Sequence, residues 1–199
     1  MRQTVYLVRH VEPNYDNHDD ATRELTAKGK QDCQLLVDFF KQRPINQIVS
    51  SPYKRAVETI QPVADQLGLS IELMADFRER KIDDVWIEDF KTFTANQWQD
   101  FAYKHSDSGE SLAEVQHRTI AALTVLLENS RAEQLIVSSH GTTISTMLNY
   151  YNPKFGLADF ERIKTLMPFV VELVFDNLTP LSITLYNLFT GESYDYTAL

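Results

Sequence analysis

The chain is poor in cysteine and contains no long apolar run. Its single cysteine, Cys33, cannot form a disulfide within the chain. No apolar stretch approaches the roughly 20 residues that a helix needs to cross a bilayer. The N-terminus also lacks the apolar segment of a secretory signal. We therefore expect a cytoplasmic protein without a membrane partner.

Positive charge is also scarce. Lysine and arginine number 19 against 28 aspartate and glutamate residues, for a formal net charge of -9, and residues 170–199 contain no lysine or arginine. Nucleic-acid binding requires a basic face, so a nucleic acid is not an expected partner. An anionic small molecule stays compatible with this charge, because a cleft focuses the field of the residues that line it.

The order of strand and helix signals is typical of an α/β sheet with covering helices. Buried strands are expected at residues 5–8, 48–49, 71–74 and 135–137, with a closing pair at 170–175 and 181–189. Helices are expected at 26–43, 52–68, 111–127 and 142–151, the first three starting at Thr26, at Ser51 with Pro52, and at the capping box of Ser111 and Glu114. Repeats and low-complexity linkers are absent, so residues 1–199 are interpreted as one domain.

An aromatic-rich stretch interrupts this alternation at about 82–108. It holds Trp86, Phe90, Phe93, Trp98, Phe101 and Tyr103 among acids and amides. We interpret it as a helical insertion of one or two helices that lies over the edge of the sheet. Its aromatic stripe is typical of core packing, and a lid that sets substrate choice is the alternative interpretation.

Basic side chains follow two of the expected strands. Arg9 and His10 come directly after the first strand, and His140 ends the fourth. Arg55 falls within the first turn of the helix that follows the second strand. Ligands of open α/β sheets bind beyond the carboxyl ends of the strands, so we expect these four residues to share one crevice.

Two histidines and two arginines in one crevice indicate phosphoryl chemistry. The planar forks of Arg9 and Arg55 suit phosphate oxygens, and the helix N-terminus at Arg55 favours anions. Neutral His10 would attack phosphorus to form a phosphohistidine, and flanking positive charge would keep its ring neutral. His140 would donate a hydrogen bond to the transferring group. Glu79, past the third strand, would protonate the departing oxygen.

Several motifs occur in an order that resembles the histidine phosphatase superfamily, also called the phosphoglycerate mutase-like group. They are Leu7–Glu12, Leu25–Thr26 with Gly29, Ser50–Ala56, Gly109–Ser111 and Ser139–Gly141, and the resemblance covers residues 4 to about 147. It implies a three-layer α/β fold with a mainly parallel central sheet flanked by helices. It also implies a small phosphorylated substrate, a phosphohistidine at His10, phosphoryl binding by Arg9, Arg55 and His140, proton donation by Glu79, and no metal or other cofactor.

The chain departs from the family pattern in places. Val11 stands where many members have glycine, and the Gly-x-Trp-Glu-Gly sequence that often follows the acid is missing. The second departure leaves Asp83 or Asp84 as an alternative to Glu79. The asparagine often found past the nucleophile has no counterpart in perfect register. The candidates for substrate binding are Asn14, Asn17 and Gly141.

Other catalytic classes fit the sequence less well. A cysteine phosphatase needs an arginine six residues after its cysteine, and Cys33 is followed there by Phe39. Residues 109–113 resemble a serine-hydrolase elbow, but no strand precedes them.

A metal site also fits the sequence less well. His10, Glu12 and His140 are ligand types, but Arg9 and Arg55 beside them would repel a divalent cation. We therefore expect no metal.

Two rival functions would use the same pocket. A phosphosugar or phosphoglycerate mutase must bind a second anionic group, and the longer mutases of the family carry a basic segment after the acid for this purpose. Residues 82–108 are instead acidic and aromatic, with Lys91 and Lys104 as their only lysines or arginines, which favours hydrolysis. A silent phospho-ligand binder would not require an intact nucleophile.

The closing strand pair offers an edge through which a homodimer would form.

Overall fold

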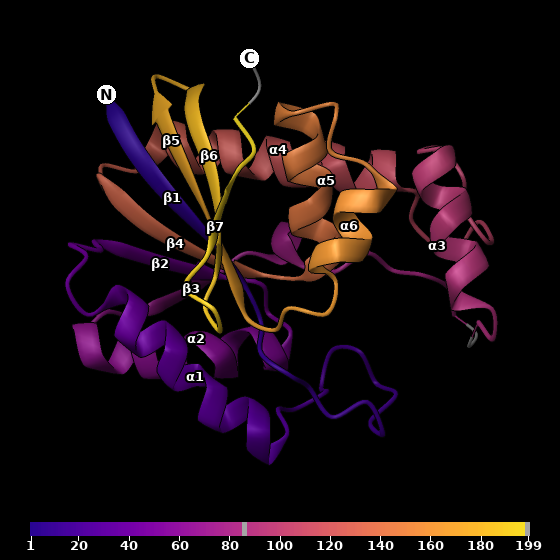
Figure 1. Cartoon of the computed structure of the whole chain (residues 1–199), viewed down its shortest axis with the longest axis horizontal. Coiled ribbons are helices and arrows are strands. Elements are labelled where there is room, and N and C mark those ends of the chain that lie inside the picture. The colour runs from indigo at the N-terminus through magenta and orange to yellow at the C-terminus, as the bar shows by residue number, and fades with distance from the viewer. Residues whose placement is uncertain (85–86, 198–199) are drawn as a thin grey trace.

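The computed structural model describes residues 1–84 and 87–197. Figure 1 shows a seven-stranded sheet in the order β3-β2-β4-β1-β5-β6-β7 with its helices. The strands are β1 (Arg2–Arg9), β2 (Gln47–Ser50), β3 (Ile71–Leu73), β4 (Gln134–Ser139), β5 (Phe169–Asp176), β6 (Thr179–Asn187) and β7 (Ser193–Asp195). The helices are α1 (Ala27–Phe40), α2 (Lys54–Leu67), the 3-10 turn η1 (Ala75–Phe77), α3 (Phe90–Gln99), α4 (Leu112–Asn129), α5 (Gly141–Tyr151) and α6 (Leu157–Ile163). Among the described residues, no helix is long and apolar enough to span a membrane.

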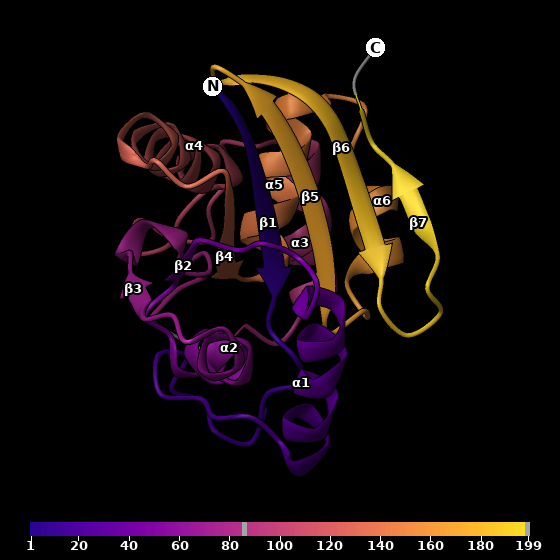
Figure 2. The ribbon, with the colours of Figure 1, turned by 90° about the vertical axis from the view of Figure 1, so that its left-hand side faces the viewer.

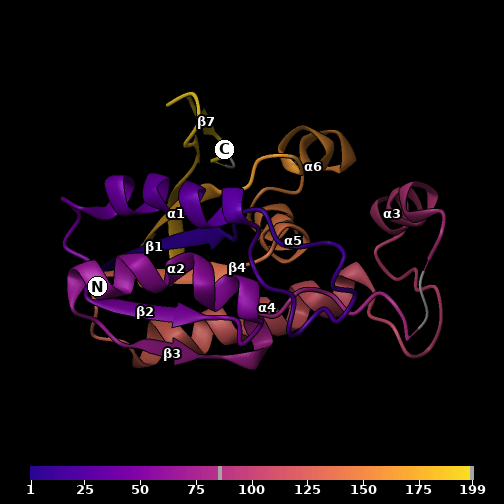
Figure 3. The ribbon, with the colours of Figure 1, turned by 90° about the horizontal axis from the view of Figure 1, so that it is seen from below.

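The first four strands of the chain run parallel. β1 pairs with β4, β4 with β2, and β2 with β3, all in parallel, while β5 joins β1 in antiparallel register. Figure 3 shows, from below, that the parallel strands run toward the side where α3 lies. The mainly parallel α/β sheet expected from the sequence is confirmed.

Alternate side chains of the strands face two separate hydrophobic layers. Tyr6 and Val8 of β1 pack with the inner faces of α1 and α2. Val5 and Leu7 point to the opposite layer, formed with α4, α5 and α6. The two-residue period of a strand makes this division. Figure 2 shows α1 and α2 on one side of the sheet and α4 and α5 on the other, which completes the three-layer arrangement.

Two helix starts follow their local capping signals. The Thr26 hydroxyl accepts the Gly29 N–H at 2.9 Å and begins α1. Ser111 and Glu114 form reciprocal side-chain to backbone bonds and begin α4. Both predicted caps are confirmed.

The predicted start of α2 is wrong by two residues. The helix begins at Lys54 with Tyr53 as its N-cap, not at Pro52. The Ser51 hydroxyl accepts the Tyr53 N–H at 3.2 Å and lies 2.8 Å from His140 Nε2. The Ser51 side chain therefore contacts His140 and does not cap a helix.

The aromatic-rich stretch does not lie over the edge of the sheet, so that prediction is also wrong. Among its described residues the helix is α3, which lies beyond the ends of the parallel strands and packs against α6 (Figure 1). The Trp98 ring lies 6.0 Å from Phe155 and 5.4 Å from Phe160, measured between centroids. Aromatic contact with another helix, rather than with a strand, holds α3 there. The predicted Trp86 lies outside the described residues.

The C-terminal strands also differ from the expectation. β5 lies inside the sheet beside β1, and β6 is paired with β5 on one side and β7 on the other. β7 pairs only with residues 184–186 of β6, so the first residues of β6 stay at the edge of the sheet, and a homodimer through this pair stays a prediction. The edge strand β7 and the short helix α6 were not predicted.

Candidate active site

Parallel pairing of β1 and β4 brings the two predicted histidines together. Arg9 is in register with Ser139, and the His10 N–H donates to the Ser139 carbonyl at 3.2 Å. His140 directly follows β4, and its ring centroid lies 5.2 Å from that of His10. Arg55, from the first turn of α2, donates from Nε to His10 Nε2 at 3.3 Å. The structure therefore brings His10, His140 and Arg55 together beyond the carboxyl ends of the parallel strands.

The His10 ring is held in one tautomer. Its Nδ1 lies 2.7 Å from the Val11 carbonyl oxygen. A carbonyl can only accept, so Nδ1 carries the proton and Nε2 presents its lone pair. The bond uses the backbone of Val11, while its side chain is fully buried with Leu25 and Cys33. Valine at this position therefore leaves the orientation of the imidazole intact.

Both imidazoles are held neutral. Burial first, and then the charges of Arg55 and Arg9, keep the pKa of His10 well below its usual value of 6.5. Burial and Arg55 lower the pKa of His140 in the same direction. Neutral His10 keeps the lone pair that a nucleophile needs.

His140 has one ring nitrogen bonded to Ser51 and one without a hydrogen-bond partner among the described residues. Its Nε2 lies 2.8 Å from the Ser51 hydroxyl, which can donate its own proton to this nitrogen. In that tautomer Nδ1 is protonated. Nδ1 is buried and has no hydrogen-bond partner among the described residues. A buried donor without a partner is costly, and a bound oxyanion would satisfy it.

Arg9 is anchored by a helix end that the sequence did not indicate. Its Nη1 donates to the carbonyls of Ile163 (3.2 Å), Lys164 (2.7 Å) and Leu166 (3.0 Å), at and just past the C-terminus of α6. Burial lowers the pKa of Arg9 to about 10, so the guanidinium stays charged at neutral pH. Its Nε is buried and, among the described residues, has no hydrogen-bond partner. Arg9 thus presents a second donor that a phosphate oxygen could accept.

Gly141 is packed against Arg9. A Cβ at position 141 would lie 3.0 Å from Arg9 Cζ, closer than ordinary van der Waals contact. The glycine lets the start of α5 approach the guanidinium. Its place beside Arg9 explains why the crevice requires a small residue here.

Arg55 is paired with an acidic residue that sequence reasoning missed. Its Nη2 lies 3.1 Å from Asp20 Oδ1, and its Nη1 donates to the Asp20 carbonyl. The same carboxylate lies 3.2 Å from Arg23 Nη1. Asp20 and Arg23 belong to the polar loop after β1, where no local pattern distinguishes them from the other charged residues.

The Glu79 carboxylate caps the start of α5. Oε2 accepts the Thr142 N–H at 3.1 Å, while Oε1 accepts the N–H groups of Thr143 and Arg80 at 3.2 and 2.8 Å. Because α5 begins directly after His140, these bonds hold the carboxylate at the crevice. Oε2 accepts only one of the bonds and has a free position for a proton.

The alternative proton donors are engaged elsewhere. Asp83 accepts from the Ser108 hydroxyl at 2.9 Å and lies 2.6 Å from His105 Nδ1. Asp84 pairs with Lys81 at 2.6 Å. Both carboxylates bond within the aromatic-rich stretch and its base, so the geometry favours Glu79.

The remaining candidates stabilise the loop after β1. The side-chain amides of Asn14 and Asn17 donate to the two oxygens of Glu24 at 2.7 and 2.9 Å. Glu12, weighed as a metal ligand, accepts from the Thr26 hydroxyl at 2.8 Å. Within the described ranges, no three histidine, cysteine or acidic side chains gather as metal ligands.

Histidine NMR would test the electrostatics of the crevice. A lowered pKa leaves the ring unprotonated below pH 6.5, so we expect the ¹⁵N signals of His10 to keep the pattern of a neutral ring as the pH falls through 6.5, where an unperturbed imidazole titrates. They should report a proton on Nδ1 and a bare Nε2 throughout. N-acetylhistidine in the same sample serves as the control. A midpoint for His10 at or above about 6.5 would contradict the assigned state.

The comparisons with known proteins agree with the motif order. The sequence model described as histidine phosphatase superfamily (branch 1) matches residues 5–187, which confirms the resemblance. Phosphoglycerate mutase-like protein 4 of Arabidopsis thaliana is 27% identical over 165 residues, which cover 75% of this chain and 71% of that protein.

Solved structures share the fold. A mycobacterial glucosyl-3-phosphoglycerate phosphatase in complex with inorganic phosphate has a TM-score of 0.67 at 17% identity, over 86% of this chain and 89% of its own. Phosphoglycerate mutase from Bacillus anthracis has a TM-score of 0.69 at 16% identity, over 90% of each chain. Together with the family match over residues 5–187, the fold leads to one conclusion: the chain belongs to the histidine phosphatase superfamily, which comprises phosphatases and mutases.

Proposed function

We propose that this protein is a metal-independent phosphatase that hydrolyses a small phosphorylated metabolite through a phosphohistidine at His10. One observation carries the proposal: the unprotonated Nε2 of His10 lies beside Arg55 and His140, and the nearby Arg9 Nε and His140 Nδ1 are buried without a described hydrogen-bond partner. A phosphoryl group would satisfy both donors while it meets the nucleophile.

In the first half-reaction, His10 Nε2 attacks phosphorus and the bond from phosphorus to the alcohol oxygen breaks. Arg9, Arg55 and His140 stabilise the charge on the equatorial oxygens. Glu79 gives its proton to the departing oxygen, so the alcohol leaves neutral.

In the second half-reaction, water attacks the phosphohistidine. The Glu79 carboxylate takes a proton from this water, the bond between Nε2 and phosphorus breaks, and inorganic phosphate leaves. Nε2 recovers its lone pair and Glu79 its proton. The donors that bind the phosphoryl group serve both steps.

A mutase is the second candidate, because the Arabidopsis relative carries that name. A mutase needs free cations for a second anionic group of its substrate. Lys104 pairs with Glu114 at 2.7 Å, and Lys81 pairs with Asp84 at 2.6 Å. The two lysines are thus paired with acids and not free to bind a second anionic group, which supports hydrolysis over transfer.

Rapid quenching with a ³²P-labelled phosphomonoester tests the proposal. We expect transient label on the protein that is stable to base and released by acid, with equal turnover when EDTA is present. Labelled 3-phosphoglycerate should give inorganic phosphate. Label that moves to another hydroxyl would establish the mutase, and binding without label on the protein or release of phosphate would establish a silent binder.

A further inference from the structure

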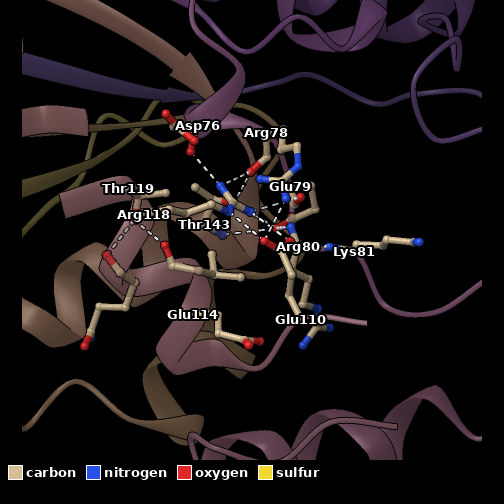
Figure 4. A network of polar contacts seen from close by, with 12 residues as sticks. Asp76, Arg78, Glu79, Arg80, Lys81, Glu110, Glu114, Arg118, Thr119 and Thr143 are labelled. Atoms are coloured by element: carbon tan, nitrogen blue, oxygen red, sulfur yellow. Dashed lines mark hydrogen bonds and ion pairs between the residues drawn. The ribbon is translucent and has the colours of Figure 1, made fainter. Parts of the chain in front are cut away.

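The backbone around Glu79 accepts hydrogen bonds from one guanidinium, which belongs to a helix distant in the sequence. Arg118 of α4 donates from Nη1 to the carbonyls of Asp76 and Arg78, the latter at 3.0 Å, and from Nη2 to the carbonyl of Glu79 at 3.3 Å (Figure 4). The Asp76 carbonyl lies in η1, and the other two lie between η1 and the aromatic-rich stretch. A planar, five-donor group suits several acceptors at once.

Glu110 orients this guanidinium. Its two oxygens accept from Arg118 Nε at 2.8 Å and Nη2 at 3.1 Å, a bidentate pair. Glu110 also accepts from Arg78 Nη2 and from the Lys81 N–H, both at 2.8 Å (Figure 4). The carboxylate therefore holds the chain on both sides of Glu79. The side chains of Glu110 and Arg118 are 15% and 13% exposed, so water screens the pair weakly.

Local structure leaves Glu110 little freedom. A Cβ on Gly109 would lie 2.2 Å from the Ile82 carbonyl oxygen, so residues 109 and 82 are in direct backbone contact. On the other side, the capping box of Ser111 and Glu114 sets the start of α4. The ion pair of Glu110 and Arg118 is thus fixed in position, and it holds the backbone around Glu79 in place relative to α4.

We propose that Arg118 and Glu110 are positioning residues that hold the Glu79 carboxylate where it transfers a proton to the leaving group. The proposal rests on the role of Glu79 proposed above. Proton transfer requires hydrogen-bond distance, and a displacement of about 1 Å costs up to about 100-fold in rate. α5 holds the Glu79 carboxylate and, through the Thr143 hydroxyl, the Arg78 carbonyl at 2.9 Å, while the Glu79 carbonyl itself is held by Arg118.

The test compares two substrates that differ in their need for an acid. p-Nitrophenyl phosphate has a good leaving group, and phenyl phosphate a poor one. Because Glu79 also serves the hydrolysis of the phosphohistidine, which is common to both substrates, the step to compare is protein phosphorylation, measured by rapid quenching in a single turnover. Glu79→Gln should lower the rate of this step by about 100-fold with phenyl phosphate and by less than about threefold with p-nitrophenyl phosphate. Arg118→Met and Glu110→Gln should reproduce this selectivity at about tenfold, and Arg118→Lys should recover part of the loss.

The double variant separates positioning from folding. If Arg118 acts through Glu79, Arg118→Met added to Glu79→Gln should lower the rate of protein phosphorylation by phenyl phosphate no further. Arg131→Met, which removes an exposed arginine just after α4, serves as the control and should leave both rates unchanged. Thermal unfolding of each variant reports whether the fold is retained.

The outcomes distinguish the two proposals. Equal losses on both substrates for Arg118→Met and Glu110→Gln, or multiplied losses in the double variant, would overturn the positioning role alone. Loss of folding in Arg118→Met together with unselective kinetics in Arg118→Lys and Glu110→Gln would do the same. Unselective kinetics in Glu79→Gln would overturn the proton-donor role and the positioning proposal with it.

Discussion

His10→Ala should lower kcat for p-nitrophenyl phosphate by at least about 10⁴-fold, because no other group in the crevice can form the covalent intermediate. The Nε2 of His10 is unprotonated and accepts a hydrogen bond from Arg55 Nε. His140 lies beside it, but its role as a donor to the oxyanion leaves it unable to attack in its place. Steady-state kinetics and the absence of ³²P label on the protein measure the loss.

A matched control is available on α4. His117→Ala removes an exposed imidazole and should keep full activity and labelling. If His10→Ala retained more than about 1% of the activity with its fold intact, the nucleophile would have to be sought elsewhere.

Arg55→Met should lower kcat by about 10³-fold, the second largest effect we expect. The substitution removes a buried guanidinium that contacts the nucleophile at 3.3 Å and would bind the equatorial oxygens. Among the described residues, Asp20 would then keep only Arg23 as an ion-pair partner. The net charge near the phosphoryl site would become more negative. Arg55→Lys should recover only part of the loss, since a lysine cannot bind two oxygens in a fork.

The adjacent residue supplies the control for charge. Lys54→Met removes an equal charge from the same turn of α2, but Lys54 is half exposed and pairs with Glu58. We expect its activity to stay within about twofold of the original protein. A rise in KM with kcat unchanged in Arg55→Met would mean that Arg55 binds the ground state and the transition state equally.

Local patterns predicted a large part of the fold. Thr26 and the Ser111–Glu114 box mark helix starts because a capping bond joins residues three apart. The apolar runs of β1 and β4 are recognisable because strands buried on both faces carry few polar residues. Ser51 followed by Pro52 carried the same capping signal, and contact with His140 overrode it.

Other features had no local signal. α6 is a helix of seven residues, too short for a clear period. The aromatic residues of α3 indicated that the helix is partly buried but not which element it packs against. Trp98 packs against α6 and not against a strand. The outer strand β7 has three residues and pairs only with β6, so its sequence carries little pattern.

The sequence by itself determined the family and the placement of Arg9, His10 and His140 at strand ends, because these properties follow from short motifs and buried runs. The tertiary structure alone decided what supports them: Asp20 on Arg55, the α6 carbonyls on Arg9, and Arg118 beneath Glu79. These contacts join residues 35, 155 and 39 positions apart. Every residue has a backbone carbonyl, and charged residues occur throughout the chain, so the sequence does not indicate which of them will be partners. Only packing of the chain brings these groups within hydrogen-bond distance.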